Sequence, residues 1–217
     1  MSLPSTIYRG HELYVPRINR REQPDIDAVV AQQTIDSKTG PLAVLRPTAS
    51  HVHTKPQLYF FATRAEVTAF TLYLARRRGM YAPVWVGSGH SDLELAAGIG
   101  ASDTTITLAA SGYTDFAFPL ESRRHLAFVS PDASVVARRV DAAEDNGDGT
   151  ETLTLESALG VAFPVYGTLV SFLTLARLDA DAVTIHWHHP NLAEARVRYV
   201  ELPREMEWPG EFPEDPA

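Results

Sequence analysis

The stretch that most constrains the fold covers residues 63–87 and reads TRAEVTAFTLYLARRRGMYAPVWVG. Thr63 suits a helix N-cap, and Glu66, three residues later, can accept a bond from the Thr63 amide. This capping box satisfies two of the amides that a helix start leaves without partners. Gly79 can adopt the left-handed conformation that commonly follows a helix end. The sequence therefore predicts a helix at about 64–78.

The expected helix has one apolar side. Val67, Phe70, Thr71 and Leu74 recur at the spacing that places side chains on a single helical face. Three arginines at 76–78 fall in the last turn, where positive charge suits the negative end of the helix dipole. Because everything around this helix reads as strand or loop, we expect it to lie on a β-sheet.

The remaining chain carries strand signals. Residues 26–33 fit a strand or a short helix, and we favour the strand. The mixed pattern at 170–178 predicts a strand covered on both faces. Asn146-Gly147 is a strong hairpin signal. Extended runs bounded by turn residues are expected at 7–15, 41–45, 57–61, 81–86, 104–109, 125–129, 135–140, 150–155, 170–178, 182–189 and 195–203.

The predicted class is mainly β with a minor α part. The helix unit ends near residue 86 and long strands resume near 169, whereas short strands with turns lie between. We therefore predict a β-sandwich host domain formed by 1–90 and 170–203, with a small β-barrel inserted at 91–169 and a C-terminal arm at 204–217. Two domains in series are the alternative.

Composition narrows the function classes. The chain has 217 residues, a net charge of −8 and no cysteine. The negative charge disfavours general affinity for nucleic acid or anionic membranes, and the lack of cysteine removes disulfides, thiol catalysis and thiolate metal sites. The first residues predict no signal peptide, and no apolar run is long enough to predict a membrane span.

The histidines of TIHWHHP form the strongest candidate metal site. His186 and His188 share a strand face if the strand is regular, so both could bind one zinc or iron ion. We favour the alternative, a strand surface that carries histidines while Ile185 and Trp187 point inward. On that interpretation the chain binds no metal and no other cofactor.

Three further groups have both a chemical and a structural interpretation. His51 and His53 have the same spacing and could add metal ligands. The acidic loop at 145–151 could bind calcium, but it lacks the twelve-residue ligand pattern and fits a hairpin turn better. Ser88, His90 and Asp92 are close in sequence, yet triad residues meet in space, and a loop is the better interpretation.

A basic patch could also be built from two arginine groups. Residues 76–78 and 123–124 could bind phosphate or a sugar acid together, although the helix dipole alone explains the first group. No catalytic motif remains after these comparisons, and we expect a protein that is not an enzyme.

Two segments resemble minor tail proteins of long-tailed bacteriophages and gene transfer agents. FATRAEVTAFTLYLARRRGMYAPVWVGSGHSDLEL is similar to their strand, helix and strand, with a helix of the form R-x-E-x-x-A-F-x-x-F/Y-L-x-x-R-x-G. The second strand then carries Ala82-Pro83-Val84-Trp85 and is followed by Asp92-Leu93. VSFLTLARLDADAVTIHWHHPNLAEARVRYVELP resembles their closing strands, which end in V-E-L-P.

The resemblance implies a structural virion protein made in the host bacterial cytoplasm and located at the tail tip. It implies a homo-oligomeric ring, hexameric or trimeric, that links the tail tube to the hub and adsorption apparatus. DNA would be only passing cargo, and no membrane insertion is expected. A neighbouring family carries four cysteines for an iron–sulfur cluster, which this cysteine-free chain cannot hold.

Two alternatives stay open beside the tail role. One is a carbohydrate-binding module for host-surface adsorption, with the inserted β domain as the lectin. The other is a metalloenzyme using His186 and His188. For the tail role, Trp208 and Phe212 in the acidic C-terminal segment are candidate oligomer anchors, because large aromatics are depleted in disordered spacers. The start of the chain, 1–21, is a second candidate arm.

Overall fold

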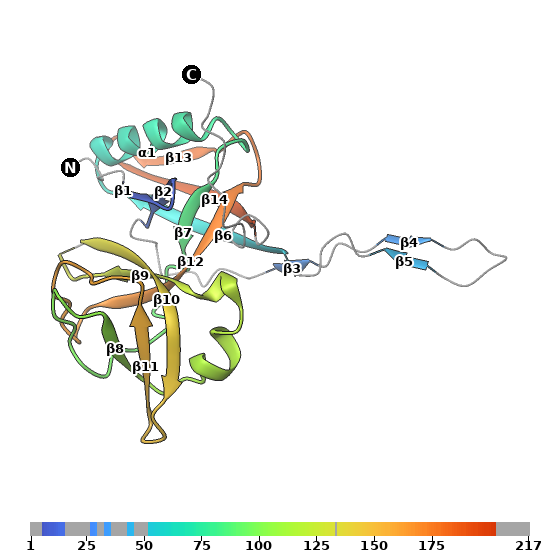
Figure 1. Cartoon of the computed structure of the whole chain (residues 1–217). Coiled ribbons are helices and arrows are strands. Elements are labelled where there is room, and N and C mark those ends of the chain that lie inside the picture. The colour runs from blue at the N-terminus through green and yellow to red at the C-terminus, as the bar shows by residue number, and fades with distance from the viewer. Residues whose placement is uncertain are drawn as a thin grey trace. The chain divides into compact units, whose positions relative to one another are not determined.

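The computed structural model describes residues 6–15, 27–29, 33–35, 43–45, 52–132 and 134–202. These residues divide into two compact units (Figure 1). Unit 1 contains the described parts of 17–83 together with 176–202. Unit 2 contains 6–15 and the described parts of 84–175. The class is mainly β, as predicted.

Unit 1 is built on two long antiparallel strands. β6 (Val52–Phe61) pairs with β14 (Leu192–Glu201) along most of its length. β3 (Asp27–Val29) pairs with β6, and β13 (Ile185–His189) pairs with β14. The last residues of β12 (Leu169–Leu178) also pair with β14. These described strands form a single sheet covered by a helix, which differs from the predicted sandwich of two sheets.

Helix α1 (Arg64–Arg77) begins at the predicted capping box. Glu66 Oε2 accepts bonds from the Thr63 amide at 3.3 Å and from the Ala62 amide at 2.7 Å. The helix ends one residue earlier than expected, because Arg78 already has the left-handed conformation, with φ of 48°. Gly79 follows with φ of 65°.

The buried face of α1 is rotated from the predicted one. Val67 and Phe70 are buried, but Thr71 is exposed and Leu74 only half-buried. Tyr73 takes the buried position, because its hydroxyl lies 3.1 Å from the Tyr199 hydroxyl on the sheet. The exposed threonine instead donates to a carbonyl within the helix.

The contact between helix and sheet is aromatic and partly polar. The ring of Phe70 lies 4.9 Å from Phe61 and 5.7 Å from Tyr59, measured between ring centroids. The Tyr59 hydroxyl donates to Gln57 Oε1 and lies 3.0 Å from the Tyr199 hydroxyl. Buried hydroxyls that bond to one another avoid the cost of an unsatisfied polar group.

β4 (Gln33–Ile35) and β5 (Ala43–Leu45) form a sheet of their own. They are antiparallel, with Thr34 opposite Val44. Among the strands that the structure describes, each of the two pairs only with the other.

Unit 2 contains a small closed barrel. Residues 169–175 of β12 are followed across the sheet by β9 (His125–Val129), β10 (Val135–Asp145), β11 (Thr150–Leu155) and β8 (Thr105–Ala109). An extended segment closes the ring, because Leu95 bridges to Leu108 in β8 and Leu93 bridges to Val170 in β12. A π-helical turn (Tyr113–Ala117) and a 3₁₀ turn (Glu121–Arg123) connect β8 to β9.

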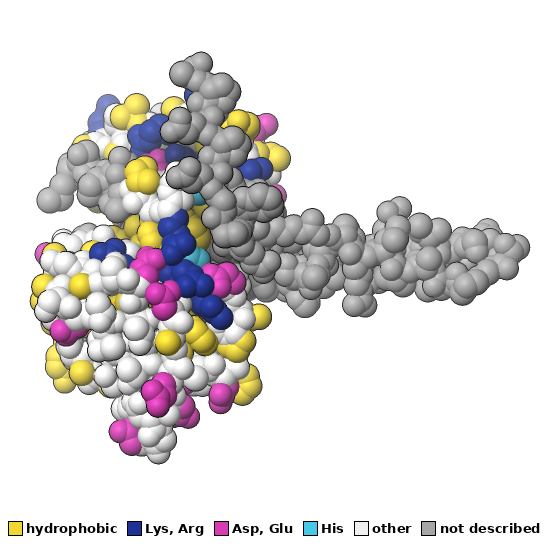
Figure 2. Space-filling view, in the orientation of Figure 1, with side chains coloured by type: hydrophobic (Ala, Val, Ile, Leu, Met, Phe, Trp, Pro, Cys, Tyr) yellow, Lys and Arg dark blue, Asp and Glu magenta, His cyan; other side chains and the backbone are white. Residues whose placement is uncertain are grey.

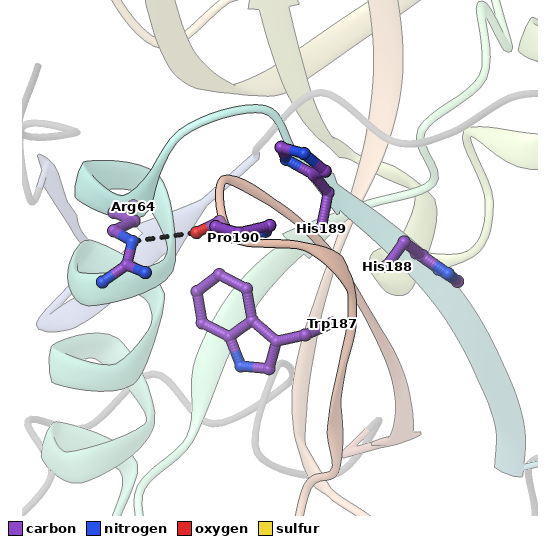
Figure 3. A pocket seen from close by; sticks show the side chains of 5 residues that line it. All are labelled: Arg64, Trp187, His188, His189 and Pro190. Atoms are coloured by element: carbon purple, nitrogen blue, oxygen red, sulfur yellow. Dashed lines mark hydrogen bonds between the residues drawn. The ribbon is translucent and has the colours of Figure 1, made fainter.

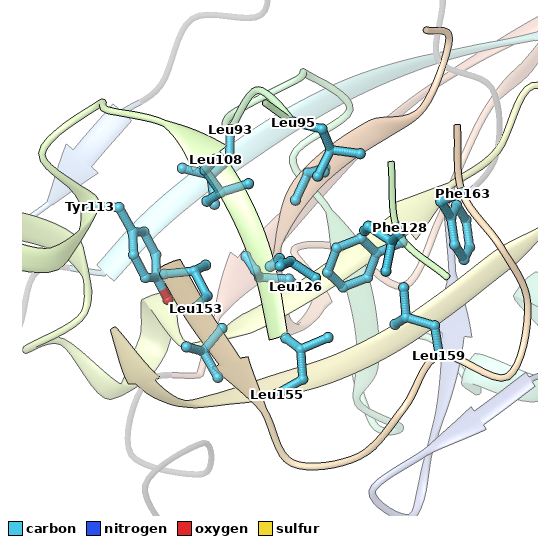
Figure 4. Close-up of a cluster of buried hydrophobic side chains, with 14 residues drawn as sticks. Leu93, Leu95, Leu108, Tyr113, Leu126, Phe128, Leu153, Leu155, Leu159 and Phe163 are labelled. Atoms are coloured by element: carbon cyan, nitrogen blue, oxygen red, sulfur yellow. The ribbon is translucent and has the colours of Figure 1, made fainter. Parts of the chain in front are cut away.

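The barrel encloses an apolar core, which Figure 4 shows in part. Alternating strand residues contribute Ile106, Leu126, Phe128 and Leu153, all nearly without solvent contact. The whole buried cluster comprises Leu93, Leu95, Ile99, Ile106, Leu108, Tyr113, Leu126, Phe128, Val140, Leu153, Leu155, Leu159, Phe163 and Val170.

The boundaries of unit 2 differ from the predicted insertion at 91–169. β1 (Thr6–Tyr8) and β2 (His11–Tyr14) form a hairpin, and β2 pairs in parallel with β7 (Val84–Gly87). This pairing places the first strands of the chain in unit 2, whereas the prediction assigned them to the host domain. No helix within the described residues is long and apolar enough to cross a membrane.

Candidate functional site

A shallow depression in unit 1 is the candidate site (Figure 3). It has a volume of about 380 Å³. One lining residue is the first residue of helix α1, three are the last residues of β13, and the fifth is a proline in the turn after β13. The lining residues are Arg64, Trp187, His188, His189 and Pro190.

Arg64 ties the helix start to the turn after β13. Its Nε donates to the Pro190 carbonyl oxygen at 2.8 Å, the bond drawn in Figure 3. Its guanidinium carbon lies 6.0 Å from the centre of the Trp187 ring, within the range of a cation–π contact. The arginine therefore holds both the turn and the indole that line the depression.

Trp187 does not point inward as predicted, because 51% of it is exposed. Among the described strands, β13 pairs only with β14, so it is an edge strand with one covered side. Ile185 is half-buried, and the four residues that follow it in the strand are exposed. The expected alternation of buried and exposed side chains is therefore absent here, because the end of β13 is exposed on both faces.

A β-bulge separates the two candidate metal-binding histidines. Trp187 lies opposite Ala193 and His189 opposite Leu192, which leaves His188 as the extra residue. The two-residue repeat that would place His186 and His188 on one face is therefore interrupted. His188 Nε2 instead lies 3.3 Å from Glu194 Oε1.

No group of three or more histidine, aspartate or glutamate side chains in the described part of the chain is arranged to hold a metal ion. His51 lies outside the described residues. His53 belongs to β6, but its side chain lies outside them too. A contribution of these two histidines to a site stays a prediction.

Ser88, His90 and Asp92 fasten a loop to the barrel of unit 2. The Ser88 hydroxyl donates to Asp92 Oδ2, and the same carboxylate oxygen accepts the Phe172 amide at 2.7 Å. His90 donates its backbone amide to the Ser88 hydroxyl at 3.2 Å. The serine is therefore held by an aspartate rather than by an imidazole, which fits the preferred interpretation of a loop.

The acidic loop forms the predicted hairpin between β10 and β11. Asp145 accepts the Gly147 amide at 2.9 Å, and Asp148 accepts the Thr150 amide at 3.0 Å. Glu151 is buried and accepts the Tyr113 amide at 3.2 Å. These carboxylates thus bond to backbone amides of the turn and of the neighbouring helical turn.

The two arginine groups have separate structural roles. Arg77 is buried, and its Nη1 donates to the Pro83 carbonyl at 2.6 Å within unit 1. In unit 2, Arg123 lies over the Phe172 ring, and Arg124 Nε donates to the Phe118 carbonyl at 2.8 Å. Each of these arginines thus has a partner in its own unit.

A buried polar cluster in unit 2 was not predicted. The Tyr8 hydroxyl lies 2.9 Å from His125 Nδ1, and the Trp85 ring lies 4.7 Å from the imidazole. Burial lowers the pKa of His125 to about 4, with Arg9 adding to the effect. The imidazole is therefore neutral at physiological pH. At 1% exposure it has no access for a substrate, so its role is structural.

Trp208 and Phe212, the predicted anchors, lie outside the described residues, as does the whole predicted arm at 204–217. Arg64 and Glu194 belong to the site region but were not singled out from the sequence. A comparison with known protein families finds no family model that matches the chain, and a comparison with curated proteins finds no relative.

The depression combines an exposed aromatic face with a guanidinium group, two imidazoles and one carboxylate nearby. Such a surface can stack an apolar face of a ligand and bind polar groups at its edge. None of the described contacts places a nucleophile beside a base in this depression.

Proposed function

We propose that the protein is a structural component of a bacteriophage tail tip and assembles with copies of itself into a ring between tail tube and hub. Support comes from the resemblance of its two segments to minor tail proteins. The elements follow in the expected order, with the end of β6, α1 and β7 in the first segment and β12, β13 and β14 in the second.

The observation that carries the proposal is the separate β4–β5 ladder. A two-stranded sheet is marginally stable alone in water, and its outer edges leave backbone groups without a strand partner. Among the described strands neither edge of this ladder is paired. A neighbouring copy that adds a strand to one edge would complete the sheet, as in other forms of β-augmentation.

Such a contact is head-to-tail, because the ladder of one copy meets a different surface of the next. Head-to-tail contacts generate closed rings when the rotation between copies closes. The predicted arm at 204–217 would add contacts of the same kind. The other predicted arm, 1–21, does not fit this role as a whole, because its residues 6–14 form the β1–β2 hairpin that pairs with β7 within unit 2. A net charge of −8 also suits a channel through which DNA passes without adhering.

The test compares the full chain with a variant in which residues 31–47 are replaced by a short Gly-Ser linker. Light scattering coupled to size-exclusion chromatography should give a closed oligomer for the full chain and a monomer for the variant. Because the ladder is a separate sheet, the melting temperature of the monomeric variant should stay close to that of unassembled full-length protein. Asp148→Asn, at the tip of the β10–β11 hairpin, is the control and should still assemble.

A full chain that remains monomeric at all concentrations would contradict the proposed ring. Unchanged assembly of the linker variant would show that the ladder is not the contact, and the structural support for the proposal would be lost. Detection of the protein in purified virions, at a copy number that matches the ring, would then test its location at the tail.

A further inference from the structure

We infer that the depression around Trp187 binds an acidic saccharide, that is, a pyranose ring that carries a carboxylate. The inference rests on unit 1 alone and does not depend on the proposed tail function. It gives the open carbohydrate-binding alternative a specific site, which lies in the helix-and-sheet unit rather than in the inserted β domain.

The indole of Trp187 provides the stacking surface. About half of this large side chain is exposed, although burying it would be favourable. The cation–π contact with Arg64 and the bond from Arg64 to the turn restrain its surroundings. An exposed aromatic ring with a fixed orientation suits the C–H-rich face of a sugar, because the face of the ring is electron-rich.

Arg64 provides the charge that selects an acid. Among its three guanidinium nitrogens, only Nε forms a hydrogen bond with a described residue, and the partner is the Pro190 carbonyl oxygen. The two terminal nitrogens keep their N–H groups for a ligand, in the fork geometry that matches a carboxylate. No acidic side chain in the described part of the chain forms an ion pair with Arg64, so a ligand carboxylate would meet no competitor there.

The histidines provide groups for hydroxyls. The imidazole of His189 has no hydrogen-bond partner among the described residues and lines the depression in Figure 3. His188 and Glu194 form a neighbouring pair. A neutral imidazole both donates and accepts one hydrogen bond, as a sugar hydroxyl requires, and the carboxylate accepts further bonds.

The size of the site favours a saccharide over a protein partner. A volume of about 380 Å³ lies near the lower end of small-molecule sites, which begin at about 300 Å³. A stable protein interface buries about 800 Å² on each partner, more than five residues supply. The chain is acidic overall, so selection of an acid here must come from direct contact rather than from long-range attraction.

The experiment is a calorimetric titration of the full chain with trigalacturonic acid and, separately, with its methyl ester. Saturable binding in the millimolar range is expected for the acid, with binding of the ester at least about tenfold weaker because the charge is removed. Trp187→Ala and Arg64→Met should each weaken binding of the acid by at least about tenfold.

Two control variants separate the contact from general effects. Tyr166→Ala removes an aromatic that is 91% exposed in unit 2 and should bind the acid as the unaltered chain does. Arg64→Lys keeps the charge but loses the fork, so its binding should fall between those of the unaltered chain and Arg64→Met. The melting temperature of each variant verifies that unit 1 is folded.

Absence of saturable binding would overturn the inference, as would equal binding by Trp187→Ala. Equal binding of acid and ester would overturn the assigned role of Arg64 and the acidic class of ligand. Because Trp187→Ala leaves the β4–β5 ladder intact, its oligomeric state should be unchanged. Failure of saccharide binding and failure of ring assembly are therefore distinguishable.

Discussion

The two units have cores of different composition. Unit 2 closes a ring of strands around leucine, phenylalanine and valine side chains, and the buried imidazole of His125 lies outside that cluster. In the described part of unit 1, helix α1 covers a sheet, and the contact depends on aromatic rings, among them tyrosines whose hydroxyls bond to one another. The core of unit 2 depends mainly on the total volume of its side chains and on the pattern of apolar residues along its strands. The contact in unit 1 depends on particular side chains, whose hydroxyls must find one another.

The largest expected effect is at the centre of the contact in unit 1. Phe70→Ala should lower the free energy of unfolding by about 3–5 kcal/mol, because the ring is 1% exposed and three aromatic neighbours would line the cavity. Denaturant melts measure this loss. Leu72→Ala, two residues away but 57% exposed, is the control and should change stability little. A loss below about 1 kcal/mol for Phe70→Ala would show that the helix does not rely on this contact.

Acid should destabilise unit 2 through the buried imidazole of His125. The pKa of His125 is held at about 4 by burial, compared with 6.5 in an unfolded chain, so unfolded protein binds the proton more readily. The free energy of unfolding of unit 2 should therefore be highest above pH 6.5 and fall by up to about 3 kcal/mol as the pH drops to about 4.

Unfolding measured between pH 7 and pH 4.5 tests this difference. His125→Phe should remove most of the pH dependence in that range. The pKa of Glu121 is lowered by its bond to Arg139, with burial opposing, so loss of that pair on protonation destabilises unit 2 only at lower pH. Equal acid sensitivity of His125→Phe and the unaltered chain would exclude the imidazole as the cause.

A smaller effect compares one glycine from each unit. A Cβ added at Gly79 would clash with Asp181 Oδ1, the atom that accepts the Met80 amide, whereas a Cβ at Gly147 would meet nothing within 4 Å. Both have positive φ, 65° and 72°, so both Ala variants carry a backbone cost of about 1–2 kcal/mol. Gly79→Ala should lose about 1 kcal/mol more, because it also disrupts the Asp181 bond. Equal losses in thermal melts would show that this contact contributes nothing.

Local signals in the sequence predicted most of the elements. The capping box placed the start of α1, and strict alternation predicted β11 at its observed bounds. The extended run HLAFV, followed by turn residues, predicted β9 at its observed bounds. The consecutive buried residues Leu173, Thr174, Leu175 and Ala176 agree with a strand covered on both faces. These features depend on neighbours in sequence, and for that reason they could be found.

What could not be predicted depends on partners distant in sequence. Tyr73 is buried instead of Leu74 because its hydroxyl forms a hydrogen bond with the Tyr199 hydroxyl on β14, and periodicity alone does not distinguish the two positions. The bulge at His188 breaks the repeat on which the expected face was based. His125 is one polar residue in an apolar run, and only its contact with Tyr8 shows what satisfies it.

The proposal that this chain forms a ring is tested most directly by electron microscopy of the purified full-length protein, with averaging of single particles viewed end-on. We expect closed rings around an open channel, with one rotational symmetry, three-fold or six-fold, and no dependence on added ligand. Single copies alone, or open chains without closure, would contradict the proposed tail-tip ring.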